Sequence, residues 1–304
     1  MNNPSNRGRF GRVLSTYAER VKAFQPNARY YLISAILTGA ALGVFRLLFN
    51  FYVLSQGYDE ALLGTLITTN SLTALLAALP MGYLVDIIGR KIALILGGLA
   101  ITAAIFGMVL LPSTAMFVAM SVLIGLGNAL TGVTMGPFLM ENSSEKERTY
   151  LFSFAAGLQM AAGSVGNWVG GYLPTWMAAL NGTTPTSPQS YAWSLGVIAA
   201  AGAAGVLPLL LMRMPKLERG ERSLFAPLSY FKDHSALLGR LILPMLIISV
   251  GAGLVMPFMN VFFRQVHGQP DQVIGTMFAW GSLAMGVGLL IAPPLAGRVG
   301  QIQV

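Results

Sequence analysis

Eight long apolar stretches constrain the fold of this sequence more than any other feature. A run of about 18 or more apolar residues with few charges is typical of a helix that crosses a lipid bilayer. We place the spans at about 30–54, 61–81, 92–111, 115–139, 150–174, 191–212, 240–263 and 272–296. The sequence therefore predicts an all-α polytopic membrane protein whose main partner is the lipid bilayer.

The basic residues are distributed unevenly among the loops that join these spans. The net charge is +8, and a positive net charge can indicate binding to nucleic acid. Here, however, the lysines and arginines precede the first span or follow an even-numbered span, except Arg264 in an odd-numbered loop and Arg46 inside the first span. This is the positive-inside pattern. It predicts a cytoplasmic N-terminus in the cytoplasmic (inner) membrane and no nucleic-acid partner.

The residue types that catalytic and metal sites need are scarce. The sequence has no cysteine, which excludes disulfides, thiolate metal sites and cysteine catalysis. It shows no metal-ligand cluster, no nucleophile–base set and no phosphate-binding loop. We therefore expect neither an enzyme nor a metal site nor a cofactor.

A ten-residue polar stretch separates the second and third spans. It reads Gly82-Tyr83-Leu84-Val85-Asp86-Ile87-Ile88-Gly89-Arg90-Lys91, and its aspartate and basic pair predict a short loop at the membrane surface. The stretch resembles the signature loop of the major facilitator superfamily, G-x-L-a-D-r-x-G-R-k. Six positions match and Ile87 replaces a basic residue; the matching residues are Gly82, Leu84, Asp86, Gly89, Arg90 and Lys91.

An internal repeat supports the resemblance. Residues 47–52, LLFNFY, resemble residues 257–262, PFMNVF, 210 positions later, so that Asn260 repeats Asn50. A degenerate copy of the signature falls on residues 295–301 and has lost the aspartate but keeps an arginine. Two parallel six-helix halves joined by a long cytoplasmic loop are the architecture of this superfamily.

The resemblance implies the domain organisation. Residues 30–212 would form the N-terminal six-helix bundle, 213–239 a cytoplasmic inter-bundle loop, and 240–304 the first two helices of a C-terminal bundle. Residues 1–29 carry apolar side chains at helical spacing among basic residues, which predicts a cytoplasmic amphipathic helix, with a disordered tail as the alternative. We expect helices nine to twelve in the full-length protein and, without them, loosely held helices seven and eight.

The resemblance also implies a gating role for charged residues at the cytoplasmic side. Asp86 would face the start of a helix of the opposite half, where the helix dipole favours a carboxylate. Glu141 and Arg148 would join the signature loop in a charge network that breaks on opening. The alternatives are that Asp86 only solvates a turn, and that Glu141 and Arg148 serve helix capping and topology, since Ser144 and Glu147 of the same loop, between spans four and five, form a capping-box pattern.

Polar residues inside the spans are the candidates for substrate binding. Arg46 is the one charged residue inside a span and not at its end, and Asn50 lies one turn further on the same face. A guanidinium suits a carboxylate or phosphate, and snorkelling or an internal ion pair is the alternative. Asn128, Gln159 and Asn260 either bind substrate or form interhelical hydrogen bonds.

The most consistent function is transport of a small solute by alternating access, with an organic anion or a drug-like compound as substrate. The alternative is a non-transporting sensor, scaffold or inactive gene fragment on the same fold. No Asp or Glu lies within a predicted span, so we expect no proton carrier there. Small-residue pairs, Gly132 with Gly136 and Gly166 with Gly170, predict close helix packing.

Overall fold

The computed structural model describes residues 24–213 and 235–299. These residues form helices without strands, which confirms the predicted fold class. The helices are α2 (Pro26–Ser55), α3 (Glu60–Ile88), α4 (Arg90–Leu110), α5 (Thr114–Glu141), α6 (Glu145–Asn181), α7 (Pro188–Leu210), α9 (Ser235–Val255), the 3₁₀ turn η1 (Met256–Phe258), α10 (Met259–Gln265) and α11 (Asp271–Val299). Most of the predicted N-terminal segment and of the inter-bundle loop lies outside the described residues.

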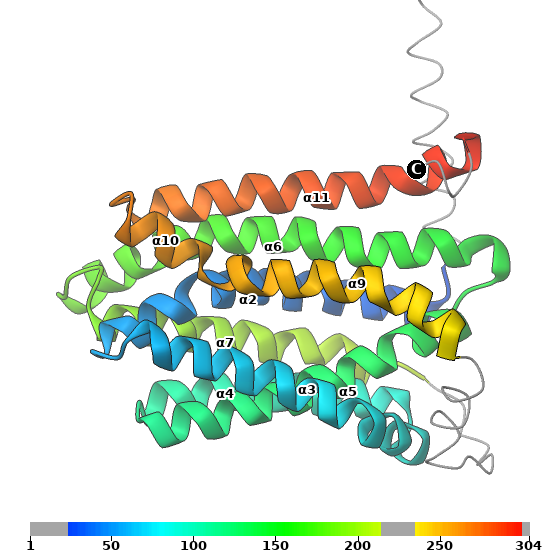
Figure 1. Ribbon diagram of the computed structural model, residues 1–304, viewed down its shortest axis with the longest axis horizontal. Helices are drawn as coiled ribbons and strands as arrows, with labels where there is room; N and C mark the ends of the chain where they lie inside the picture. Colours follow the sequence, from blue (N-terminus) through cyan, green and yellow to red (C-terminus); the bar gives the residue numbers. More distant parts are fainter. Residues whose placement is uncertain (1–23, 214–234, 300–304) are drawn as a thin grey trace, which may run out of the picture.

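The helices lie side by side along the long axis of the molecule, and consecutive helices run in opposite directions (Figure 1). We call the end where α2, α4, α6 and α10 finish the distal face, and the end where α3, α5, α7 and α11 finish the proximal face. In the first bundle α2 packs against α6 and α7, α7 against α4, α4 against α5, and α5 against α3. Because α2 and α3 hardly touch, the ring of helices is open between α2 on one side and α3 and α5 on the other.

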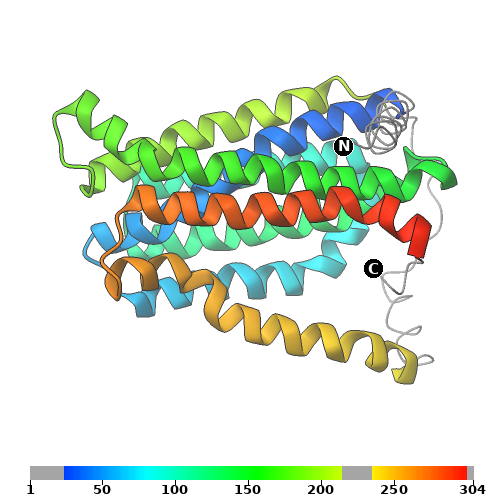
Figure 2. The same ribbon diagram turned by 90° about the horizontal axis from the view of Figure 1, so that it is seen from above.

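Seven helices within the described residues are long and apolar enough to cross a membrane. The exception among the eight predicted spans is 150–174, which lies in α6. α6 packs against α2 on one side and α11 on the other (Figures 1 and 2). A helix so enclosed needs less apolar surface than one that faces lipid all round.

Small residues bring α6 close to both of its neighbours. A Cβ added to Gly166 would overlap the carbonyl oxygen of Ala40 in α2, and one added to Gly171 would lie 2.7 Å from the carbonyl oxygen of Asp271 in α11. Both pairs therefore approach backbone to backbone, as small residues allow in membrane helices.

The two predicted glycine pairs differ. Gly166 and Gly170 pack against α2, as expected. A Cβ on Gly132 or Gly136 would meet no atom of the described residues within 4 Å, so the expected packing is absent there.

The predicted seventh span is not one continuous helix. α9 ends at Val255, a 3₁₀ turn contains Pro257, and α10 begins at Met259. Proline cannot donate the backbone hydrogen bond that a regular helix needs. α9 diverges from the other helices (Figure 2) and its span is not buried. α11, by contrast, packs closely along α6, so the expectation of loose packing is wrong for helix eight.

The signature stretch is mostly helical, so its prediction as a loop is wrong. Residues 82–88 form the last two turns of α3, and α4 begins at Arg90. Gly89 alone separates the two helices, with φ 88°, a conformation that glycine adopts without steric cost. The predicted span ended where polar residues begin, but a helix continues past an apolar run because its backbone hydrogen bonds do not depend on side-chain polarity.

Candidate functional site

A cavity of about 420 Å³ lies within the open side of the first bundle. Its walls come mainly from α2, α4, α5 and α7, and on α2 they extend from Tyr31 near the proximal face to Arg46, past the middle of the helix. Beyond Arg46 the distal half of the bundle is filled by a large apolar cluster that includes Leu47, Phe51 and Tyr191. The cavity is therefore closed toward the distal face.

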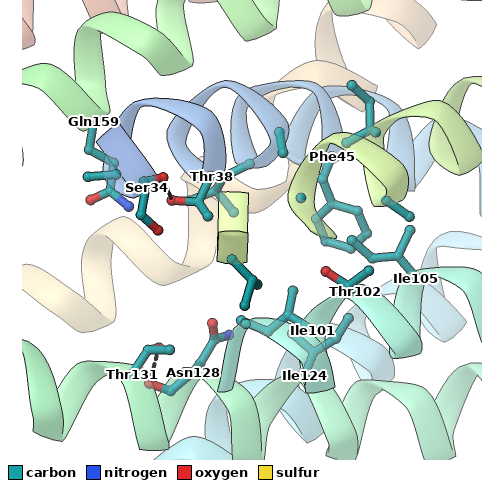
Figure 3. A pocket seen from close by; sticks show the side chains of 18 of the residues that line it. Ser34, Thr38, Phe45, Ile101, Thr102, Ile105, Ile124, Asn128, Thr131 and Gln159 are labelled. Carbon is teal, nitrogen blue, oxygen red and sulfur yellow. Dashed lines mark hydrogen bonds between the residues drawn. The ribbon is translucent and has the colours of Figure 1, made fainter. Parts of the chain in front are cut away.

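The cavity has an apolar wall and a polar rim. Phe45, Ile101, Ile105 and Ile124 form the apolar wall (Figure 3). Polar side chains from α2, α3, α4, α5 and α6 surround it; they are Ser34, Thr38, Arg46, Asn70, Thr102, Asn128, Thr131 and Gln159. A mostly apolar pocket with a few convergent polar groups is typical of a small-molecule site.

Arg46 supplies the positive charge of this site. Its side chain is exposed on the cavity wall, and its guanidinium forms no hydrogen bond or ion pair with any residue the structure describes. Five N–H donors in a planar fork are thus available to a ligand. The sequence alternative of an internal ion pair finds no support among the described residues.

Two amides face the cavity from different helices. Asn128 of α5 donates from Nδ2 to Oδ1 of Asn70 in α3, at 3.3 Å. Gln159 of α6 lies beside Ser34 and Thr38 (Figure 3). The structure thus brings Arg46, Asn128 and Gln159 together in one cavity, as a shared role in binding requires.

Sequence reasoning missed Asn70, which belongs to the same cavity. It is the one asparagine of the second span, and this polar residue inside an apolar run was the available signal. Thr38, Thr102 and Thr131 gave no comparable signal, because a threonine is common in membrane helices, where its hydroxyl bonds its own backbone. Thr131, for example, donates to the carbonyl of Gly127 at 2.9 Å.

Asn50 and Asn260 do not reach the cavity. They are 4% and 3% exposed and contact each other, with Nδ2 of Asn50 donating to Oδ1 of Asn260 at 2.9 Å. Asn50 also donates to the carbonyl of Pro257 at 2.7 Å, and Asn260 to that of Leu47 at 2.8 Å. Both amide groups are therefore engaged in joining α2 to α10, which does not support a substrate contact in this conformation.

The predicted gating residues gather at the proximal face, but only some of them contact each other. Arg90 forms an ion pair with Glu141 and donates to the carbonyl of Pro137 at 3.1 Å, which joins the start of α4 to the end of α5. Asp86 is partly exposed in the last turn of α3. The Nε of Arg148 is buried and has no hydrogen-bond partner among the described residues.

Lys91, the last predicted gating residue of the signature stretch, contacts α7. Its Nζ donates to the carbonyls of Leu210 and Met212, both at 2.7 Å. These groups belong to the C-terminal end of α7, where unpaired carbonyls and the helix dipole favour a cation. Gly82 lies in open space, since an added Cβ would meet no described atom within 4 Å.

Comparisons with known proteins agree with this architecture. A family model described as the Major Facilitator Superfamily matches residues 31–304. No curated protein sequence matches the chain.

Two solved structures share the fold. One is a bacterial homologue of the human lysosomal transporter Spinster, in an inward-facing and unoccupied conformation, with a TM-score of 0.67 and 17% identity over 90% of this chain and 63% of that chain. The other is the nucleoside transporter NupG, with a TM-score of 0.58 and 16% identity over 90% of this chain and 69% of that one. The chain thus spans less than two thirds of the Spinster homologue.

Proposed function

The chain belongs to the Major Facilitator Superfamily, and from this membership and the cavity we propose that it acts as a carrier of a small solute by alternating access. In such carriers the substrate site lies near the middle of the bilayer, between two bundles that rock about it. The observation that carries the proposal is a mostly apolar cavity with a few convergent polar side chains, which ends past the middle of α2, with the distal side closed by packed side chains. The basic loops favour the proximal face as the cytoplasmic one.

Arg46 favours an organic anion over a neutral or cationic substrate. At an effective dielectric constant of about 20, a carboxylate about 4 Å from a guanidinium gains about 4 kcal/mol. A neutral hydrogen bond contributes only about 0.5–1.5 kcal/mol. Because Arg46 has no partner among the described residues, an anion would also satisfy a charge that is expensive to hold in a membrane.

The apolar wall defines the rest of the ligand. Phe45 and the isoleucines opposite it suit an aromatic or aliphatic body, while Asn128 and Gln159 can bind polar substituents. An amphipathic organic acid therefore fits the cavity better than a highly polar sugar or an inorganic ion.

A binding titration tests the charge preference. Naphthoate and naphthylmethylamine share one apolar body and differ in charge, and titration calorimetry measures the affinity of both. We expect the purified full chain to bind naphthoate, with at least tenfold weaker binding in Arg46→Lys and none in Arg46→Gln. Arg240→Gln, which changes an exposed arginine at the proximal start of α9, is the matched control and should bind as the wild type does.

Two outcomes would contradict the proposal. Equal affinity of Arg46→Gln and the wild type, or preference for the amine, would refute an anionic substrate. Binding without naphthoate flux in proteoliposomes of the full-length protein, helices nine to twelve included, would refute carriage of this anion.

A further inference from the structure

The cavity of the first bundle is much longer than it is wide. Its wall on α2 extends over residues 31–46, which at 1.5 Å per residue is about 22 Å. On α4 it extends over 94–105 and on α7 over 198–209, each about 16 Å. A compact cavity of about 420 Å³ would be only about 9 Å across. Figure 3 shows Phe45 and Ser34 toward opposite ends of this elongated space.

The two ends of the cavity differ in chemistry. The distal end carries the positive charge of Arg46. At the proximal end the wall is formed by Leu94 and Leu209, which also belong to a buried apolar cluster with Phe138. The ring of Tyr31 lies 5.2 Å from that of Phe138 and completes this end. A ligand that matches both ends has an anionic head and an apolar tail.

Most polar groups between the two ends already have a partner. The hydroxyls of Ser34, Thr38 and Thr131 each donate to a backbone carbonyl, at 2.7, 2.8 and 2.9 Å. The amide of Asn128 donates to that of Asn70 at 3.3 Å. An apolar chain that passes these groups breaks none of their hydrogen bonds, so it avoids the cost of an unpaired buried donor.

We propose that the substrate of this site is a long, unbranched aliphatic carboxylate. Its carboxylate binds the guanidinium of Arg46, and its chain extends along α2 toward Leu94 and Leu209. An extended chain with bonds of about 1.52 Å advances about 1.25 Å per carbon, so the walls of α4 and α7 have room for about 12 carbons. The inference rests on the carrier function proposed above and deepens it by defining the shape of the apolar body.

A series of straight-chain alkanoates tests the length of the site. Titration of the purified full chain in nanodiscs, referred to the free aqueous concentration of each acid, removes the contribution of partition into lipid. We expect the affinity to rise about fourfold with each CH₂ group that enters the cavity. The rise should end at about 12 carbons, where the chain reaches the proximal end.

A side chain added at Gly202 of α7 should shorten the cavity. An added Cβ would lie 3.4 Å from Oγ1 of Thr102 in α4 and 4.0 Å from Cβ of Ala41 in α2, so Gly202→Val narrows the space between three walls. This level is about 7 Å from Arg46 along α2. We expect the ratio of dodecanoate to hexanoate affinity to fall at least a hundredfold, since about six CH₂ groups lose their place.

Gly196→Val is the matched control, because it makes the same change on the same helix where an added Cβ meets no described atom within 4 Å. It should keep the wild-type affinity ratio. If Gly202→Val fails to fold, Ala41→Leu replaces it and narrows the cavity at the same level from α2.

Photolabelling determines the direction in which the acid lies. Dodecanoate with a diazirine on its last carbon should label Leu94 or Leu209 at the proximal end. The corresponding hexanoate should label Phe45 or Ile105, which line the cavity near Arg46. Arg46→Gln should weaken the binding of every acid by the same factor and leave the gain per CH₂ group unchanged.

Three results would overturn the inference: an affinity that does not depend on chain length, a wild-type affinity ratio in both Gly202→Val and Ala41→Leu, or photolabelling confined to exposed residues of α3 such as Leu75 and Leu76. Naphthoate binding together with a flat alkanoate series would refute the long chain and leave the carrier proposal standing. Binding of neither naphthoate nor any alkanoate would refute both.

Discussion

The contact between α2 and α6 should tolerate no added side chain at Gly166. A Cβ there would overlap the carbonyl oxygen of Ala40 and lie 2.9 Å from its carbonyl carbon and 3.0 Å from its Cα. All three are backbone atoms of a packed helix, so no rotamer change relieves the overlap. Gly166→Ala must therefore push the two helices apart.

The expected cost follows from the size of that displacement. Moving the helices apart by about 1 Å forfeits a quarter to a half of the dispersion energy of the contacts involved. Overpacking typically costs about 1–3 kcal/mol, and two rigid backbones place this case at the upper end. Alanine regains about 0.5–1 kcal/mol of helix propensity. The net loss is about 2 kcal/mol, or about 4–8 °C in Tm for a chain of this size.

Gly132→Ala is the matched control, because it makes the same change where an added Cβ meets no described atom within 4 Å. It should keep the propensity gain and raise Tm by a few degrees. Thermal unfolding in detergent, followed by tryptophan fluorescence, to which Trp168 and Trp176 on α6 contribute, measures both. Equal Tm values for the two variants, or wild-type stability of Gly166→Ala, would refute the backbone contact.

Two further predictions concern the contact between α2 and α10 and the orientation of the chain in the membrane. Asn50→Ala and Asn260→Ala should each lower the free energy of unfolding by about 1–2 kcal/mol, because each change leaves a buried amide unpaired. The double variant removes the pair as a whole, so its loss should be clearly smaller than the sum of the two single losses. Additive losses in a double-mutant cycle would mean that the two amides act independently. Of two variants with a single cysteine, Ser55→Cys should react with an impermeant maleimide added outside intact cells, and Ser144→Cys should not. Labelling of Ser144→Cys would reverse the assigned orientation.

The fold could be predicted from the sequence because its strongest signals are local. Apolar runs of membrane length and the side on which basic loops lie need no knowledge of partners. The break at Pro257 was also visible in the sequence, but a mostly apolar run from 240 to 263 outweighed it. α6 shows the limit in the other direction, since its lower hydropathy reflects packing between α2 and α11, which no local pattern reveals.

The candidate site was predictable only in part, because the hydrogen-bond and ion-pair partners of a residue depend on the tertiary structure. Arg46 was identified because a charge in a span is rare. Asn70 was overlooked although it is the partner of Asn128. Asp271 was assigned to a loop because it precedes an apolar run, yet a basic residue in an odd-numbered loop, Arg264, pointed to a nearby carboxylate that compensates it.

The contacts of Asn50 and Asn260 follow the symmetry of the sequence repeat. Asn50 binds the carbonyl of Pro257, and Asn260 binds the carbonyl of Leu47. Position 257 is the repeat equivalent of position 47, as 260 is of 50, so each asparagine makes the contact that its copy makes in return. Reciprocal contacts of this kind arise where equivalent surfaces meet across a two-fold axis. These reciprocal contacts support the pseudo-two-fold relation between parallel repeats that the architecture of the superfamily implies. A residue on such an axis would face its own copy, and each of the two buried amides has the other as a hydrogen-bond partner.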